Sequence, residues 1–206
     1  MMADATAFGY GDLHFTWGDH ICTIFENRGQ QMSVMVPFMV QGIQEGQRCV
    51  WASPEPAAAA FREELMKAGA DLPTLEASGQ LIIIPAVDYY LHDGVFEPEK
   101  TLELAELLYE DSVRSGYTGI RATGDVSWLE GDPVDLELWE GYERTFTERL
   151  RGKRVVTVCQ YDQRRFSGAY VVAALHTHPI VILGETVCRN PFFVEEEAMA
   201  ERPQIH

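Results

Sequence analysis

Acidic and aromatic side chains gather where the apolar runs of this sequence end. Five such segments are Phe25-Glu26-Asn27, Ser53-Pro54-Glu55, Asp88-Tyr89-Tyr90, Asp125-Val126-Ser127-Trp128 and Tyr161-Asp162. If the runs are parallel strands, these segments meet at the edge of the sheet where open α/β sheets bind ligands. A rim of carboxylates and aromatic rings with almost no cations suits an apolar or cationic ligand and repels a phosphate. The alternative is that each acidic residue only caps the next helix.

Thiols and imidazoles offer a second kind of chemistry. The four cysteines are widely spaced and form no Cys-x-x-Cys pair: Cys22, Cys49, Cys159 and Cys188. This usage favours buried free thiols in a reducing compartment. His20 and Cys22 share a face if they lie on a strand and could converge on a metal, whereas His176 and His178 diverge if they lie on a helix. We expect no metal and no other cofactor, with a zinc or haem site as the alternative.

The motifs of nucleotide and hydrolase chemistry are absent from the sequence. After the first apolar run, where a P-loop needs GxxxxGK[ST], the chain reads Glu26-Asn27-Arg28-Gly29-Gln30-Gln31-Met32, with one glycine and no lysine. Neither GxGxxG nor GxSxG occurs. Asp125 has the place of a magnesium-binding acid but lacks a phosphate cradle as its partner. We therefore expect no enzyme, and a Cys–His or Tyr–Asp pair in a cleft would point the other way.

Strand and helix patterns alternate along the chain. Strands are predicted over residues 20–26, 48–52, 80–87, 118–126 and 154–161, helices over 31–44, 54–68, 97–115, 136–150 and 167–176, and a terminal hairpin over 179–183 and 186–189. Alternation of this kind predicts an α/β fold with a mostly parallel central sheet, helices on both faces and a C-terminal β-hairpin. Arg121 and Glu143 are expected to form a structural ion pair across the sheet face, with a binding role as the alternative. His178 and Asn190 are expected to form turns, with ligand binding as the alternative.

The length and the net charge of the chain favour a single globular domain and exclude some classes of binding partner. The chain has 206 residues and a formal net charge of −16, which fits one large domain that binds neither nucleic acid nor an anionic membrane directly. The N-terminus has no signal-peptide pattern, and no apolar run approaches the ~20 residues that span a bilayer. These features predict a cytoplasmic protein.

Several short motifs, taken in order, resemble one family. They are Gly18-Asp19-His20-Ile21-Cys22-Thr23-Ile24-Phe25-Glu26, Gly42-Ile43-Gln44-Glu45-Gly46-Gln47-Arg48-Cys49-Val50-Trp51, Gly124-Asp125-Val126-Ser127-Trp128, Tyr142-Glu143, Cys159-Gln160-Tyr161-Asp162, His178-Pro179 and Asn190-Pro191-Phe192-Phe193. Together they resemble the MEDS domain, the sensory domain of DcmR-like regulators from methanogens and methylotrophs. The resemblance implies a RecA/KaiC-like fold that has lost its P-loop, and a sensory role with small hydrocarbon derivatives as ligands.

The resemblance also sets the predicted domains and partners. We expect an N-terminal extension at 1–18, a MEDS-like sensory domain at 19–194 and an acidic flexible tail at 195–206. Since relatives are often fused to signalling domains and this sensor occupies nearly the whole chain, we expect a stand-alone sensor that signals through a partner protein such as a histidine kinase or a transcription regulator. A homodimer is expected by analogy with KaiC-like relatives.

The leading hypothesis is a regulatory domain that binds a small, largely apolar organic molecule. The predicted ligand-binding residues are His20, Cys22, Glu26, Trp128, Cys159, Tyr161 and Asp162. Aromatic rings would supply flat walls with one polar tip each, and thiols a polarisable lining. Two alternatives stay open: a ligand-free interaction module, such as an anti-sigma or kinase-associated regulator, and a metal or haem sensor that uses thiols and histidines.

Overall fold

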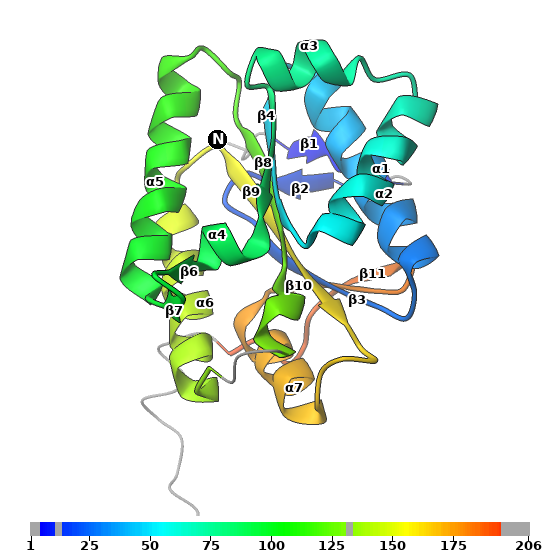
Figure 1. The fold of residues 1–206 in the computed structure, drawn as a ribbon. Helices are drawn as coiled ribbons and strands as arrows, with labels where there is room; N and C mark the ends of the chain where they lie inside the picture. Colours follow the sequence, from blue (N-terminus) through cyan, green and yellow to red (C-terminus); the bar gives the residue numbers. More distant parts are fainter. Residues whose placement is uncertain (1–4, 11–13, 131–133, 195–206) are drawn as a thin grey trace, which may run out of the picture.

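A seven-stranded sheet between two layers of helices forms the core of the protein (Figure 1). The computed structural model describes residues 5–10, 14–130 and 134–194. The strands are β3 (His20–Phe25), β4 (Arg48–Ser53), β5 (Leu81–Pro85), β8 (Ile120–Asp125), β9 (Val155–Asp162), β10 (Ile180–Leu183) and β11 (Thr186–Arg189). Their order is β11-β10-β3-β9-β8-β4-β5, and all neighbours are parallel except the antiparallel pair β10–β11. The predicted α/β class and the C-terminal hairpin are confirmed.

Helices cover both faces of the sheet. One face carries α1 (Arg28–Gln44), α2 (Glu55–Lys67) and α3 (Leu72–Ala77), and the other carries α4 (Ala86–Tyr90), α5 (Pro98–Arg114), α6 (Leu136–Leu150) and α7 (Gly168–Thr177). A 3₁₀ helix, η1 (Val126–Glu130), follows β8, and two small hairpins complete the fold: β1 (Ala5–Ala7) with β2 (His14–Thr16), and β6 (Leu91–His92) with β7 (Val95–Phe96).

Side chains of the central strands alternate between these two layers. On β9, Val156 and Val158 pack on the α1–α3 side, whereas Cys159 and Tyr161 pack on the α4–α7 side. All eight residues of β9 are buried. Both faces of a central parallel strand are covered by helices. Successive side chains of β9 therefore point into two different apolar layers, and none of them points to solvent.

Arg121 belongs to the α1–α3 face, which corrects one prediction. Its guanidinium donates Nη1 hydrogen bonds to the backbone oxygens of Phe8 at 2.7 Å and Phe38 at 2.9 Å, and its Nη2 lies 3.3 Å from a carboxylate oxygen of Glu45. Glu143 lies on the opposite face of the sheet, in the layer of α6. The predicted ion pair between Arg121 and Glu143 is therefore wrong: the strand between them separates the two side chains.

The N-terminal segment contributes to the core. Phe8 and Phe15 are buried against α1, where the ring centroids of Phe8 and Phe38 lie 4.7 Å apart. The predicted acidic tail at 195–206 lies outside the described residues. Within the described part of the chain, no helix is both long enough and apolar enough to cross a membrane.

Candidate functional site

An apolar cavity lies between helices α5 and α6 and strands β4, β8 and β9. The space between its walls, including its opening to solvent, is about 740 Å³. The described residues that line it are Val50, Ala52, Tyr89, Tyr90, Leu102, Ala105, Glu106, Leu108, Tyr109, Ile120, Ala122, Thr123, Gly124, Tyr142, Phe146, Arg149, Leu150, Lys153, Val155, Thr157 and Cys159. The cavity therefore lies on one face of the sheet, beside the strands, and not beyond their carboxyl ends where the sequence placed the site.

Small residues on the strands and α5 make room for the cavity. Ala52 on β4, Ala122 on β8 and Ala105 on α5 line the cavity with single methyl groups. Gly124 lets the hydroxyl of Tyr90 approach the strand, because a Cβ at this position would collide with that oxygen. The result is a pocket with aliphatic and aromatic walls, of the kind that holds small organic molecules.

Charged side chains occur only at the exposed part of this lining. Lys153 and Arg149 reach Glu106, with nitrogen–oxygen separations of 3.1 Å and 3.7 Å. Arg149 also pairs with Glu99, at 2.7 Å. The two cations and two carboxylates therefore balance, and every charged group that the structure describes in this lining is paired.

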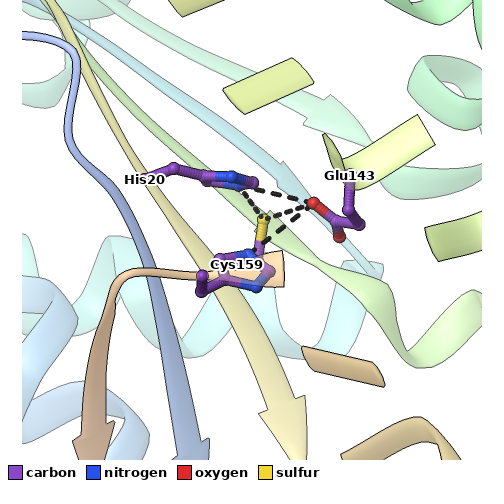
Figure 2. A group of neighbouring side chains, drawn as sticks. His20, Glu143 and Cys159 are labelled. Atoms are coloured by element: carbon purple, nitrogen blue, oxygen red, sulfur yellow. Dashed lines mark hydrogen bonds and ion pairs between the residues drawn. The ribbon is translucent and has the colours of Figure 1, made fainter. Parts of the chain in front are cut away.

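At the inner end of the cavity, Cys159 belongs to a second feature, a fully buried cluster of four potential ligands. One ligand atom each from His20, Glu143, Cys159 and His178 lies within 4.8 Å of the other three. Figure 2 shows His20, Glu143 and Cys159 pointing at one another. The His20 Nε2 atom is 3.2 Å from Cys159 Sγ and 3.4 Å from Glu143 Oε2, and Glu143 Oε2 is 3.6 Å from His178 Nε2. We call these four residues the polar cluster.

Neighbouring groups orient both imidazoles of the polar cluster. His20 Nδ1 lies 2.8 Å from the hydroxyl oxygen of Thr147, which itself donates to the backbone oxygen of Glu143. His178 Nδ1 donates to the backbone oxygen of Ala174 at 2.9 Å. With Nδ1 as the donor, each ring presents the lone pair of Nε2 to the cluster. His178 Nε2 is buried and has no hydrogen-bond partner within the described residues.

The carboxylate of Glu143 is oriented in the same manner. The Tyr161 hydroxyl donates to Glu143 Oε1 at 3.1 Å, and the indole nitrogen of Trp139 donates to the Tyr161 oxygen at 3.4 Å. One carboxylate oxygen is therefore engaged by this chain of donors, and the other, Oε2, faces the two histidines and the thiol.

Burial dominates the electrostatics of the polar cluster. Desolvation raises the pKa of Glu143 to about 8 and lowers the pKa of His178 to about 4. The same cause lowers the pKa of His20 well below its usual value and raises that of the Cys159 thiol well above it. Without a cation in their midst, all four groups therefore favour their neutral forms.

The turn between β3 and α1, where a P-loop would bind phosphates, is short and carries side-chain hydrogen bonds. Only Glu26 and Asn27 separate β3 from α1, and the Asn27 side chain caps the helix by accepting from the Gln30 backbone nitrogen at 3.1 Å. Asp125 accepts a hydrogen bond from Gln31 Nε2 at 3.2 Å. The sequence left Asp125 without a partner, and the structure supplies one from α1. A two-residue turn offers no nest of backbone amides for phosphates.

Comparison with known proteins identifies the chain. A sequence profile of the family described as MEDS, MEthanogen/methylotroph, DcmR Sensory domain, matches residues 19–179. The chain belongs to the MEDS family. The domain is 28% identical over 169 residues to the transcriptional repressor DcmR of Methylorubrum extorquens (strain DSM 6343 / CIP 106787 / DM4), and this match covers 81% of the chain and 60% of the relative. The family description gives this domain a sensory role, and the match spans less than two thirds of that relative's length.

A solved structure shows the same fold. The KaiC-like protein PH0186 from Pyrococcus horikoshii OT3 superposes with a TM-score of 0.60 at 14% sequence identity, over 88% of this chain and 80% of that one. At this identity the similarity concerns the fold alone. It confirms the RecA/KaiC-like architecture that the motifs implied.

The structure brings three of the predicted ligand-binding residues of the MEDS domain together. His20 and Cys159 belong to the polar cluster, and Tyr161 binds Glu143 within it. Cys159 is the only one of the seven predicted residues that also lines the described cavity. Cys22 pairs in register with Cys159 on the neighbouring strand and is buried, but it is not a member of the cluster.

The other predicted residues lie elsewhere. Glu26 is exposed after β3, and Asp162 is held by Arg164, which donates to its two oxygens at 2.9 Å and 2.7 Å. Trp128 stacks on Tyr90 with ring centroids 5.0 Å apart and lies behind the wall of the cavity. These three residues therefore do not form a common rim with the cavity.

Two members of the polar cluster were not predicted as site residues. His178 was expected to form a turn, yet it is fully buried at the end of α7, while His176 is outside the cluster. Glu143 carries a signal in the sequence: it lies on the helical stripe with Trp139, Phe146 and Leu150, which are all buried. A carboxylate in the middle of an apolar helix face is costly unless it has partners, so it marks a site.

Proposed function

We propose that this MEDS domain senses a small, largely apolar and uncharged organic molecule that binds in the cavity beneath α5 and α6. The observation that carries the proposal is the lining of the cavity, in which aliphatic and aromatic side chains make the inner walls and the few charged groups are paired at the opening. Burial of an apolar ligand in such a pocket is favourable at about 25 cal/mol per Å² of apolar surface removed from water.

The polar cluster supports a sensor and not an enzyme. A nucleophilic cysteine needs a depressed pKa and access to solvent. Cys159 is instead 5% exposed, and burial raises the pKa of its thiol. Its neighbour His20 has a lowered pKa and is fully buried, so the pair favours a neutral thiol and a neutral imidazole.

The output of the sensor is proposed to pass through another protein or domain. The relative from Methylorubrum extorquens is a transcriptional repressor, and this chain matches 60% of its length. With a net charge of −16 the MEDS domain itself is a poor ligand for nucleic acid. A histidine kinase or a transcription regulator in the cytoplasm is therefore the partner class that we propose.

A thermal-shift series with benzene, toluene, cyclohexane and 1-hexanol tests the ligand proposal. We expect at least one of them to raise the melting temperature with increasing concentration. The Ala105→Phe variant places a ring in the cavity and should abolish this rise. Ala59→Phe is the matched control, because Ala59 is exposed on α2 at the other face of the sheet.

The result that contradicts the proposal is equally specific. If none of the four molecules stabilises the protein, or if they stabilise Ala105→Phe as much as the unaltered protein, the cavity is not a binding site for small neutral molecules.

A further inference from the structure

We infer that the polar cluster is a binding site for a divalent metal ion of the zinc class, with His20 Nε2, Glu143 Oε2, Cys159 Sγ and His178 Nε2 as its four ligands. The inference goes beyond the sensing of an organic molecule and does not depend on it. It rests on the spacing, the chemistry and the orientation of the four side chains.

The spacing fits tetrahedral coordination. Zinc bonds of about 2.0–2.3 Å to nitrogen, oxygen and sulfur give a tetrahedron with edges of about 3.3–3.8 Å. Four edges of the cluster measure 3.2, 3.4, 3.6 and 3.8 Å, and the ligand atoms lie within 4.8 Å of one another in all pairs. Only small side-chain movements separate this arrangement from a closed coordination shell.

The donor set fits the same ion. One thiolate and two imidazoles favour zinc and its borderline-soft neighbours over magnesium or calcium, which require oxygen ligands. A dication would balance the negative charges of a thiolate and a carboxylate, so the occupied site would be neutral. Neutrality matters here because all four side chains are buried, and an uncompensated charge would be costly.

Neighbouring groups already hold the four ligands in position. Histidines that bind metals almost always donate their other ring N–H to a carbonyl, a carboxylate or a water, which fixes the tautomer. In this protein Thr147 and the Ala174 carbonyl take these roles for His20 and His178. Tyr161 does the same for the carboxylate of Glu143.

An unpartnered atom supplies independent support. His178 Nε2 is buried, points at the cluster and accepts no hydrogen bond from any described residue. Leaving a buried acceptor unpaired costs about 1–3 kcal/mol. A metal ion at the centre of the cluster would engage this lone pair.

The architecture indicates a structural or sensing ion and not a catalytic one. The four ligands come from β3, α6, β9 and the residue after α7, and together they fill a tetrahedral shell, whereas catalytic zinc keeps an open position. Cys159 also forms part of the cavity wall, so the cavity gives the ion a route from solvent.

Metal titration of the full-length protein tests the inference. After treatment with a chelator and its removal, the protein should bind one equivalent of Zn²⁺ and show a higher melting temperature. Co²⁺ in its place should give visible ligand-field bands of tetrahedral intensity and a thiolate charge-transfer band in the near ultraviolet. Cys159→Ser should lose the charge-transfer band, and His178→Gln should bind at least tenfold more weakly.

Matched variants separate the cluster from other thiols and imidazoles. Cys188→Ser removes an exposed cysteine, and His176→Gln removes a histidine that lies two residues before His178, outside the cluster. Both should bind Zn²⁺ and Co²⁺ like the unaltered protein. If cluster variants fail to fold, X-ray absorption at the zinc edge of the unaltered protein decides, with one sulfur and three nitrogen or oxygen neighbours expected.

Loss of the cobalt signal in Cys188→Ser, no stoichiometric zinc binding, or a zinc spectrum without sulfur would overturn the inference. These outcomes leave the thermal shifts with organic molecules untouched, and a failure of those shifts leaves the metal titration untouched. The two proposals can therefore fail separately.

Discussion

At the scale of single residues, Glu143 is the most informative side chain of the protein. It lies on the buried face of α6 among aromatic residues, and desolvation raises its pKa to about 8. A carboxylate in such a place weakens the protein unless a partner compensates its charge. Its position therefore suggests a function that outweighs the cost to stability.

The Glu143→Gln substitution separates the effect of the buried carboxylate on stability from its proposed role in metal binding. In metal-free protein we expect an equal or higher melting temperature, because the amide keeps an acceptor for Tyr161, carries a donor that can face His178 Nε2 and never ionises. Zinc should raise the melting temperature of the unaltered protein and leave that of the variant unchanged. Paired melts with chelator and with zinc measure both effects. A variant that zinc stabilises normally would show that Glu143 is not a ligand.

Tyr161 is expected to act on the metal through Glu143. Tyr161→Phe removes the hydroxyl that donates to Glu143 Oε1. Loss of a hydrogen bond that orients a metal ligand weakens metal binding by about 10–100-fold. Competition for Zn²⁺ with a chromophoric chelator measures the change. Tyr170→Phe is the matched control, since the Tyr170 hydroxyl donates to the backbone oxygen of Val134 at 3.0 Å and Tyr170 is not a member of the polar cluster. Equal affinities in the two variants would argue against this role.

At the scale of elements, Arg121 joins the N-terminal segment to α1 and the sheet. It is fully buried, and its guanidinium serves backbone oxygens of Ala7, Phe8 and Phe38. Arg121→Met would remove the donor that these oxygens share and the ion-pair partner of Glu45. We expect a loss of about 3 kcal/mol in the free energy of unfolding, because each buried acceptor left without a donor costs about 1–3 kcal/mol.

Urea unfolding of Arg121→Met measures this loss. The control is Arg62→Met, which breaks a partly exposed pair with Glu76 and should cost less than about 1 kcal/mol. Comparable losses in the two variants would show that Arg121 is not the anchor of the N-terminal segment.

The alternation of strands and helices could be predicted from the sequence because most central strands are short runs of apolar residues followed by a helical pattern. The prediction failed at residues 80–87, where the apolar run continues past the end of the strand. Pro85 ends β5 and precedes α4, so Ala86 to Tyr90 form a helix. Proline favours the first turn of a helix, and its effect outweighs the β-propensity of the residues around it.

This local error also displaced the predicted site. Tyr89 and Tyr90 were expected at a rim beyond the strand ends, but α4 folds them over the face of the sheet, where they line the cavity. The polar cluster was only half predictable. His20 and Cys159 could be identified because each lies in a recognisable motif on a predicted strand. Their proximity to Glu143 and His178 depends on strand order and helix packing, which local periodicity does not encode.

At the scale of the whole molecule, the two faces of the sheet differ in what they hold. The α1–α3 face is closed by a continuous core, and the α4–α7 face contains both the cavity and the polar cluster. Ligand and metal would therefore act on the same layer of helices.

Hydrogen exchange should show this asymmetry. Removal of zinc by a chelator should speed amide exchange in α6 and α7. Helix α6 carries Glu143 of the polar cluster and Thr147, which bonds His20, and His178 directly follows α7. Amides of α1 and α2, on the other face, should exchange at an unchanged rate. Exchange measured by mass spectrometry with and without chelator tests this, and a uniform change over both layers would contradict it.

The location of the bound organic molecule tests the proposed sensory site most directly. In two-dimensional ¹H–¹⁵N NMR spectra, the molecule that gives the largest thermal shift should perturb the backbone signals of Ala52, Ala105, Ala122 and Gly124, which line the cavity. Perturbations confined to Glu26, Asp162 and the other carboxyl ends of the strands, or none at all, would contradict a sensory site beneath α5 and α6.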